Sequence, residues 1–423
     1  MKKVLSVLLA SATALTAMGG LTACGGDSKT ITVWAPTAAI AGYKSLVSDF
    51  KKDYPEYAEW DISFTPVDEG EAATKLNTDA SSGADIFFFE AGQIQNLADK
   101  NVLRNLGESY TSEIKARDEE NWYKWVLDDE TGNALAFPTT SDNGWFLWYD
   151  SSFYTDPSEV ATLDAMLAKA KSANKNVLFK YNDGWYIPTF WFGMGCKMDY
   201  EGTTYVTDVN SDKGKIAAQS AYNYLSPSKN LMKNQKACII SNSDMNSAVG
   251  TGFQDGSVVA AFQGTWIAKD IESKMETATG GRTYEDIKCV KCPTFTAGDE
   301  QVQMGSFMAG KYCGVNAKKS GGNIQLSMAF ANYMTNERGQ TVRYETSNAG
   351  PTNIKVLALD AVKNDKAIQA VRAQQAAGGY TQLAQSSQFW TSWETFGNGI
   401  YSGTTKPTML MSELDKLAEA IKK

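Results

Sequence analysis

The 423-residue sequence contains no histidine. This absence excludes Ser-His-Asp and Cys-His catalysis, histidine-ligated zinc or iron, and proton shuttling through imidazole. An enzyme with this composition would have to act through carboxylates, tyrosine, lysine or a cofactor. We therefore expect a binding protein rather than an enzyme, with no catalytic residues, no metal and no cofactor.

Basic residues are also scarce. The chain has 40 Lys and Arg against 48 Asp and Glu, a formal net charge of -8, and no block rich in Lys or Arg. Because nucleic-acid binding needs a basic footprint, nucleic acid is not an expected partner. With 43% apolar and 11% aromatic residues the chain is too apolar for intrinsic disorder. Its length predicts two or three folded domains.

Long apolar runs are confined to the N-terminus. Lys2 and Lys3 precede residues 4–17, which are mostly Leu, Val and Ala. This run has the length of a signal-peptide core and is too short to span a bilayer. We found no other run that approaches membrane-spanning length, so the N-terminal segment is interpreted as a secretion signal.

The signal ends in Leu21-Thr22-Ala23-Cys24, which resembles the bacterial lipobox. The resemblance implies removal of residues 1–23 and diacylation of Cys24, followed by a flexible spacer over residues 24–30. We therefore expect a lipid-anchored protein on the extracellular face of a bacterial cell membrane. The alternative is a soluble secreted protein with an incidental cysteine at this position.

Five further cysteines remain: Cys196, Cys238, Cys289, Cys292 and Cys313. The pair at positions 289 and 292 has C-x-x-C spacing, but without histidine or a second pair it does not indicate a metal site. The five form one or two disulfides, with Cys196 and Cys238 as a candidate bridge, or they are reduced buried thiols. The sequence does not decide the pairing.

Alternating strands and helices run through the first third of the chain. Periodicity predicts strands at 31–34, 61–67 and 84–90, with helices over 38–54 and 70–81 between them. The segment at 84–90 contains the unbroken apolar run Ile86-Phe87-Phe88-Phe89, as in strands buried on both faces of a parallel sheet. This rhythm is typical of a doubly wound α/β domain.

A second domain is expected beyond residue 140. Two strands at 134–138 and 145–149 flank a polar turn at 139–144, where we expect the chain to cross over. The chain should return to the first domain near Pro293. The other expected elements are helices at 164–171, 211–225, 323–334 and 409–423, and strands at 257–262 and 305–315.

The order of several short motifs resembles one family across nearly the whole mature chain. These motifs are Ile31-Thr32-Val33-Trp34, Ala84-Asp85-Ile86-Phe87-Phe88, Gly92-Gln93-Ile94, Asn101-Val102-Leu103, Ala136-Phe137-Pro138, Leu147-Trp148-Tyr149, Phe253-Gln254-Asp255-Gly256, Gln263-Gly264-Thr265-Trp266, Phe330 to Gly339 and Asn348-Ala349-Gly350-Pro351. The sequence thereby resembles the extracellular solute-binding proteins of ABC importers, in particular the sugar-binding group typified by maltose-binding protein.

The resemblance implies an α/β, two-lobed, type II periplasmic-binding-protein-like fold. Each lobe would be a mostly parallel sheet flanked by helices, and a hinge would join them. We place one lobe at 27–140 with 294–355 and the other at 141–293 with 356–423. The implied function is that of a monomeric receptor that closes on a carbohydrate, a mono- or oligosaccharide, and docks on the permease of an ABC importer.

A sugar site needs flat aromatic rings for the C–H face of a pyranose and polar groups for its hydroxyl belt. Trp185 lies in a turn-rich stretch, and Trp266 directly follows a predicted strand. The resemblance implies that both rings stack on a ligand, although Trp185 could instead be structural. Trp390, at the start of a predicted helix, matches a third platform, and Trp393 could substitute for it one turn later.

Polar candidates come from strand ends, where open α/β sheets bind ligands. Glu90 ends a buried strand, but it could equally stabilise a helix N-terminus. Asp142, with Asn143 beside it, matches a family carboxylate or merely makes a turn. Gln93 stands where maltose binders carry charged residues, so maltodextrin specificity does not follow from the resemblance.

Three other functions fit part of the pattern. A binder of a non-carbohydrate solute, such as a polyamine, a metal chelate or a peptide, could use the same fold. A surface adhesin or signalling co-receptor could also be built on it. A secreted glycosidase would need tryptophan platforms and two carboxylates without histidine, but the strand rhythm does not match the folds expected for it.

Overall fold

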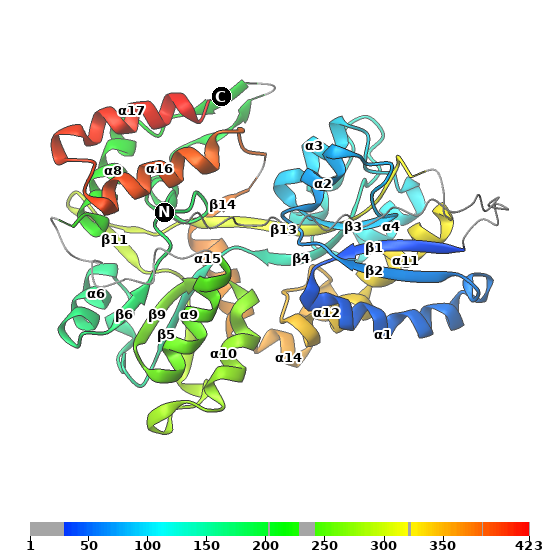
Figure 1. Ribbon diagram of the computed structural model, residues 1–423, viewed down its shortest axis with the longest axis horizontal. Coiled ribbons are helices and arrows are strands. Elements are labelled where there is room, and N and C mark those ends of the chain that lie inside the picture. Colours follow the sequence, from blue (N-terminus) through cyan, green and yellow to red (C-terminus); the bar gives the residue numbers. More distant parts are fainter. Residues whose placement is uncertain (1–28, 202–203, 228–241, 320–322, 383, 423) are drawn as a thin grey trace, which may run out of the picture.

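The computed structural model describes residues 29–201, 204–227, 242–319, 323–382 and 384–422. Within them the chain forms two lobes that lie next to each other along the longest axis of the molecule (Figure 1). Cys24 and Cys238 lie outside the described residues. In the part of the chain that the structure covers, no helix combines the length and the apolar character needed to cross a bilayer.

The first lobe is built on the predicted strands near the N-terminus. Strand β1 (Thr30–Ala35) pairs in parallel with β2 (Asp61–Pro66) on one side and with β3 (Ile86–Glu90) on the other. Helix α1 (Thr37–Asp53) follows β1 and buries Tyr43, Leu46 and Phe50, as its periodicity predicts. The expected strand, helix, strand order is therefore confirmed in this lobe.

Strand β13 (Ser306–Val315) joins this sheet from far along the chain and makes it mixed. It runs antiparallel to β3 and to β4 (Phe137–Asn143) and parallel to β14 (Gly379–Thr381). Strands β4 and β13 extend through the region between the two lobes (Figure 1). These two strands therefore form part of the connection that we expected as a hinge.

The prediction of a strand at 134–138 followed by a polar turn was wrong. The strand β4 instead covers Phe137–Asn143, and every residue in it is buried. Four of its five polar side chains have partners in other segments, and only the Thr140 hydroxyl is buried without one among the described residues. Thr139 donates to the carbonyl of Lys311 at 2.8 Å, and Ser141 donates to that of Pro351 at 2.8 Å. A polar run can therefore be a strand because tertiary contacts satisfy most of its side chains.

The second lobe contains a four-stranded sheet in the order β10 (Ile287–Val290), β5 (Phe146–Asp150), β9 (Val258–Gln263) and β6 (Asn176–Leu178). Strand β5 is antiparallel to both neighbours, and only β6 and β9 are parallel. The two-lobed α/β architecture is confirmed, but a mostly parallel sheet is wrong for this lobe. A continuous apolar run indicates burial on both faces and does not fix strand direction.

The return to the first lobe comes later than residue 294. The hairpin of β11 (Thr294–Ala297) and β12 (Glu300–Gln303) packs against helices α6 (Leu163–Ser172) and α8 (Asp212–Leu225) of the second lobe. Phe295 and Phe307 belong to the hydrophobic core of that lobe, whereas Ala309 and Tyr312 belong to the core of the first. The chain therefore crosses back within β13.

Helices cover both sheets. In the first lobe and the region between the lobes they are α2 (Ala72–Thr78), α3 (Ile94–Asp99), α4 (Gly107–Arg117), α5 (Glu120–Tyr123), α11 (Ile324–Thr335), α12 (Glu337–Ser347), α13 (Ile354–Leu357), α14 (Asp360–Lys363) and α15 (Lys366–Gly378). In the second lobe they are α6 (Leu163–Ser172), α7 (Thr189–Gly193), α8 (Asp212–Leu225), α9 (Asn242–Asp255), α10 (Ala268–Met275), α16 (Phe389–Ser402) and α17 (Leu410–Ala420), together with the hairpin of β7 (Met198–Glu201) and β8 (Thr204–Thr207). The predicted helices at 164–171, 211–225, 323–334 and 409–423 are thus confirmed within a few residues.

The four cysteines among the described residues are free thiols, and Cys196, Cys292 and Cys313 are buried. Burial in apolar surroundings raises the pKa of the Cys196 thiol to about 12. Of the two alternatives from the sequence, reduced thiols describe these four residues. Because Cys196 is one of them, the candidate bridge between Cys196 and Cys238 is not formed in this structure.

Candidate functional site

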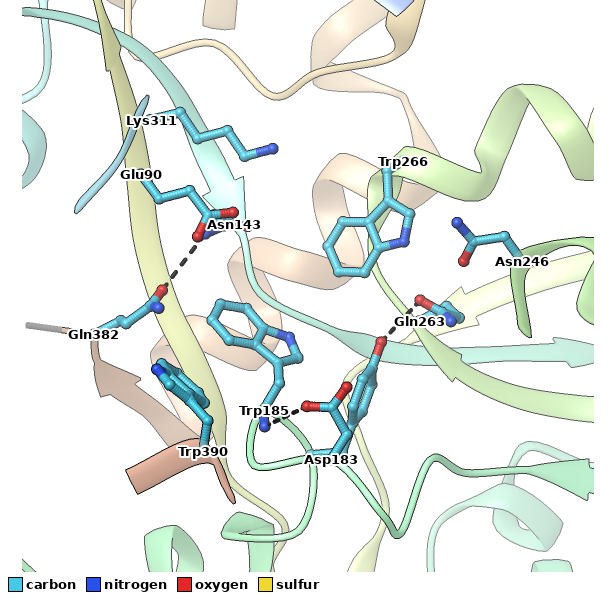
Figure 2. Close-up of a pocket in the computed structure, with 11 residues that line it drawn as sticks. Glu90, Asn143, Asp183, Trp185, Asn246, Gln263, Trp266, Lys311, Gln382 and Trp390 are labelled. Atoms are coloured by element: carbon cyan, nitrogen blue, oxygen red, sulfur yellow. Dashed lines mark hydrogen bonds between the residues drawn. The ribbon is translucent and has the colours of Figure 1, made fainter. Parts of the chain in front are cut away.

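A cavity of about 350 Å³ lies where the two lobes face each other. Figure 2 shows the side chains around it, which come from both sheets, from helices α9 and α16 and from segments between the regular elements. The lining residues are Glu90, Asn143, Asp183, Trp185, Tyr186, Asn246, Gln263, Trp266, Lys311, Gln382 and Trp390. This cavity is called the main cavity below.

Three tryptophans supply the aromatic surface of the main cavity. The rings of Trp185 and Trp390 lie beside each other, with centroids 6.3 Å apart and planes inclined by 33°. Trp266 lies across the cavity from this pair (Figure 2). Trp266 is 37% exposed and Trp390 38% exposed, which is unusual for side chains of this size. The structure therefore brings together the three platforms predicted from the sequence.

Two glycines allow these rings to lie where they do. A Cβ atom on Gly264 would lie 2.0 Å from the ring of Trp266. A Cβ atom on Gly184 would lie 2.9 Å from the Cα of Trp390. A side chain at either position would push the neighbouring tryptophan away, so both glycines are needed for close approach rather than for backbone conformation.

Polar side chains are fixed at the edges of the rings. Asp183 accepts a hydrogen bond from the backbone N–H of Trp185 at 2.8 Å with Oδ1 and from the Lys180 ammonium at 2.7 Å with Oδ2. The Tyr186 hydroxyl donates to Gln263 Oε1 at 3.0 Å. These hydrogen bonds hold the acceptors in place before any ligand arrives, which lowers the entropic cost of binding.

Glu90 and Lys311 form the charged part of the wall. They are directly opposite each other on the paired strands β3 and β13. Burial raises the pKa of the Glu90 carboxyl, and the nearby Lys311 ammonium opposes this shift. Asn143 lies beside them and donates to Gln382 Oε1 at 3.5 Å. Glu90 and Asn143, two of the site residues predicted from the sequence, therefore line the main cavity.

Asp142 points elsewhere. Its carboxylate accepts the Gly350 N–H at 2.7 Å and the hydroxyl of Thr265, and the residue is 5% exposed. It lines a small cavity of about 160 Å³ that also contacts Trp266 and Lys311. Asp142 thus ties strand β4 to the segments that hold Trp266 and Gly350, and it does not line the main cavity.

Two other predicted residues do not reach the main cavity. Gln93 donates to the Gly70 carbonyl at 2.7 Å, which ties the start of α3 to the loop before α2. Trp393 is 0% exposed and packs edge-to-face on Trp191 at 4.6 Å. A ring with no exposed face cannot stack on a ligand, so its assignment as a substitute for Trp390 was wrong. One helical turn separates a cavity position from a core position on α16.

Six further residues line the main cavity that were not predicted from the sequence: Asp183, Tyr186, Asn246, Gln263, Lys311 and Gln382. Gln263 ends strand β9, so the rule that ligands bind at strand ends could have found it. Lys311 lies in the middle of β13, and Gln382 follows a strand of only three residues. No local pattern marks these two positions, because they reach the cavity only through long-range strand pairing.

A buried ion network supports the wall behind Lys311. Glu69 accepts the Lys311 ammonium at 2.8 Å and the Arg343 guanidinium of α12 at 2.5 Å. Burial alone would raise the pKa of Glu69, but the two cations outweigh it and hold this pKa at about 2. The network therefore holds Lys311 in place and compensates the positive charge of its ammonium.

Comparison with known proteins identifies the family. The family model described as bacterial extracellular solute-binding protein matches residues 45–370, which is more than half of the chain. The chain belongs to this family. No curated protein matches the sequence at a significant level.

Solved structures share the fold of this solute-binding protein. The maltodextrin-binding protein of L. casei, solved without ligand, is 22% identical with a TM-score of 0.74, and the match covers 93% of this chain and 99% of that one. The GacH receptor of Streptomyces glaucescens, solved unliganded and with acarbose, is 19% identical with a TM-score of 0.74 over 93% and 98% of the two chains. A cyclo/maltodextrin-binding protein complexed with maltotetraose is 15% identical with a TM-score of 0.68 over 94% and 98%.

The paired positions on α16 give a direct test of which tryptophan faces the cavity. Trp393→Ala should lower the free energy of unfolding by about 3 to 5 kcal/mol, because it empties a packed core. Trp390→Ala removes a half-exposed ring and should cost less than about 1 kcal/mol. Urea unfolding of both variants measures the difference. Equal losses would show that the two rings have the same structural role.

The ion network predicts a specific loss of stability in acid. Because the folded-state pKa of Glu69, about 2, lies below its ordinary value of 4.5, its contribution is complete above pH 4.5 and is lost as the pH falls toward 2. That contribution is about 3 kcal/mol at neutral pH. Glu69→Gln should remove it, so urea unfolding should show a weaker pH dependence between pH 4.5 and 2.

The control is Glu59→Gln, which breaks the exposed ion pair with Lys29. Exposed pairs contribute little, so this variant should keep the stability and pH profile of the unmodified protein. A Glu69→Gln profile that falls as steeply as the unmodified one would contradict the assignment.

Proposed function

We propose that this protein is a cell-surface receptor that binds a carbohydrate in the main cavity and delivers it to the permease of an ABC importer. The observation that carries the proposal is the arrangement of three tryptophan rings around one cavity with fixed amides and carboxylates at their edges. This is the surface that a pyranose requires, since it offers an apolar face and a belt of hydroxyls.

The charges of the main cavity favour a neutral ligand. Asp183 is paired with Lys180, and Glu90 faces Lys311. Both carboxylates can still accept hydroxyl hydrogen bonds, which are stronger at an ionised acceptor than at a neutral one. A polyamine would need carboxylates whose charge is not already compensated. A neutral polyol therefore fits this lining better than a cation.

The names of the similar structures support the same ligand class. Among them are binding proteins for maltodextrin and a receptor solved with acarbose. At 15% to 22% identity these proteins share the fold of this chain. The proposed ligand class therefore rests on the residues that line the main cavity of this chain. We propose binding without chemical change of the ligand, because the main cavity lacks histidine and its two carboxylates are each matched by a lysine.

We also propose that the protein is monomeric and is anchored through a diacylated Cys24 after removal of residues 1–23. Support comes from the lipobox-like sequence after an apolar core and from membership of an extracellular family. Two acyl chains give stable anchoring where one chain would not.

Binding of a carbohydrate should stabilise the protein. At about 100 times its dissociation constant a ligand adds about 2.7 kcal/mol to stability, which appears as a raised melting temperature. A panel of neutral mono- and oligosaccharides should contain such a ligand, and putrescine and spermidine should give no rise. Trp266→Ala should abolish most of the rise while leaving the unliganded melting temperature nearly unchanged.

Trp60→Ala is the control for this experiment, because Trp60 packs on the core of the first lobe and lines none of the cavities described here. This variant should keep the full ligand-induced rise. Stabilisation by polyamines alone would contradict the proposal, and so would cleavage of an oligosaccharide on incubation with the protein.

Lipid anchoring is tested separately in cells. Cys24→Ser should release the protein into the medium, whereas Cys289→Ser changes another cysteine outside the lipobox and should leave it in the membrane fraction. Fractionation and immunoblotting measure the distribution. Retention of the Cys24→Ser variant in the membrane would contradict the lipobox interpretation.

A further inference from the structure

The cavity of about 160 Å³ that Asp142 lines adjoins the main cavity and is called the small cavity below. Trp266 and Lys311 line both cavities, and the Lys311 ammonium extends toward Trp266 (Figure 2). If one pyranose ring occupies the main cavity of about 350 Å³, the small cavity offers less than half of that volume. It therefore fits a substituent of a bound ring and is too small for a second ring.

Short apolar side chains form part of the lining of the small cavity. Pro36, Ala38 and Ala39, at the start of α1, contribute to it together with Ala349, which follows α12. A methyl group would pack on these side chains. A hydroxyl in the same place would exchange its hydrogen bonds with water for apolar contacts, which costs free energy. This part of the small cavity therefore favours a substituent with an apolar end.

Lys311 supplies hydrogen-bond donors to the small cavity. Its ammonium donates to Glu69 at 2.8 Å, and because an ammonium has three N–H groups, others remain for a ligand. In the same lining, Arg343 is 5% exposed, and its Nε–H has no hydrogen-bond partner among the described residues. The lining therefore holds more donors than its own acceptors satisfy. A carbonyl oxygen on the ligand would be a suitable acceptor.

Asp142 supplies the matching acceptor. Its Oδ2 accepts hydrogen bonds from both the Gly350 N–H and the Thr265 hydroxyl, whereas its Oδ1 accepts none from the described residues. The small cavity thus offers an acceptor as well as donors. Its two carboxylates, Asp142 and Glu69, are balanced by the two cations, Lys311 and Arg343. A substituent without charge, with both an N–H and a carbonyl group, therefore matches this lining.

We propose that the small cavity takes the acetamido group of an N-acetylated amino sugar whose ring lies in the main cavity. This inference rests on the proposed function and narrows its ligand class. The methyl group packs on the alanines, the carbonyl oxygen accepts from Lys311, and the N–H donates to Asp142 Oδ1. A hydroxymethyl group would leave the apolar part of the lining without contacts. A carboxylate or an ammonium would add a charge that the four charged residues do not compensate.

Matched pairs of sugars test the inference. Isothermal titration calorimetry on the purified protein would compare glucose, galactose, mannose and cellobiose with their 2-acetamido counterparts. Glucosamine, glucuronic acid and maltotriose complete the panel. In the pair that binds, the acetamido sugar should bind at least tenfold more tightly than its parent, because the parent leaves the small cavity empty and its donors unpaired. Glucosamine and glucuronic acid should gain nothing over glucose.

Ala38→Leu tests whether the small cavity is responsible for this gain. Ala38 is exposed at the start of α1, so the fold should tolerate the larger side chain, which would fill the small cavity. The variant should lose at least tenfold in affinity for the acetamido sugar and keep the affinity for the parent. The matched control is Ala41→Leu, on an exposed position of the same helix that lines neither cavity. Trp390→Ala, which affects the main cavity alone, should weaken both sugars by similar factors.

The outcomes separate the inference from the proposed function. A parent sugar that binds as tightly as its acetamido counterpart would overturn the inference and leave the proposed function standing. Binding confined to saccharides without an acetamido group would do the same, and so would an acetamido gain that Ala38→Leu does not reduce. Absence of binding for every saccharide would overturn the proposed function itself, and the inference with it. Melting temperatures of the variants verify that each one folds.

Discussion

The pairing of β13 with β3 and β4 is the interaction on which the rest of the structure depends. These antiparallel ladders join a strand from residues 306–315 to segments that precede it by more than 160 residues. Within one strand, Phe307 packs in the core of the second lobe and Tyr312 in that of the first. The same strand carries Lys311 into the main cavity. The register of β13 therefore sets both the relation of the lobes and the position of the site.

Charge compensation keeps this strand compatible with a polar site. Lys311 would be costly to bury alone, but Glu69, which is also paired with Arg343, holds it from behind, and Glu90 faces it from β3. Burial lowers the pKa of Lys311, and the two carboxylates more than reverse this shift, so the ammonium stays charged. The main cavity thus combines ionised hydrogen-bonding groups with little uncompensated charge, which suits recognition of a neutral polyol.

A small difference in position decides whether a tryptophan packs in the core or lines the main cavity. Trp390 and Trp393 share α16, yet one lines the main cavity and the other is packed on Trp191 in the core. Trp185 is intermediate, since its ring also packs on Phe307 at 4.8 Å. Because the Trp185 ring contacts both the core and the main cavity, the position of β13 affects where this ring lies in the cavity wall. The composition of the site therefore follows from helix phase and strand register rather than from the number of tryptophans.

The sequence by itself determined the family, the alternation of strands and helices, and the tryptophans at 185, 266 and 390 as residues worth placing in a site, because these depend on local periodicity and on the order of short motifs. Only the tertiary structure decided that the polar run at 137–143 is a buried strand, since Thr139 and Ser141 in it donate to carbonyls more than 170 positions away. Only the tertiary structure separated Trp390 from Trp393 and moved Asp142 and Gln93 out of the main cavity. It alone brought in Lys311 and Gln382, because strand register and long-range pairing, which local sequence does not encode, decide which side chains meet.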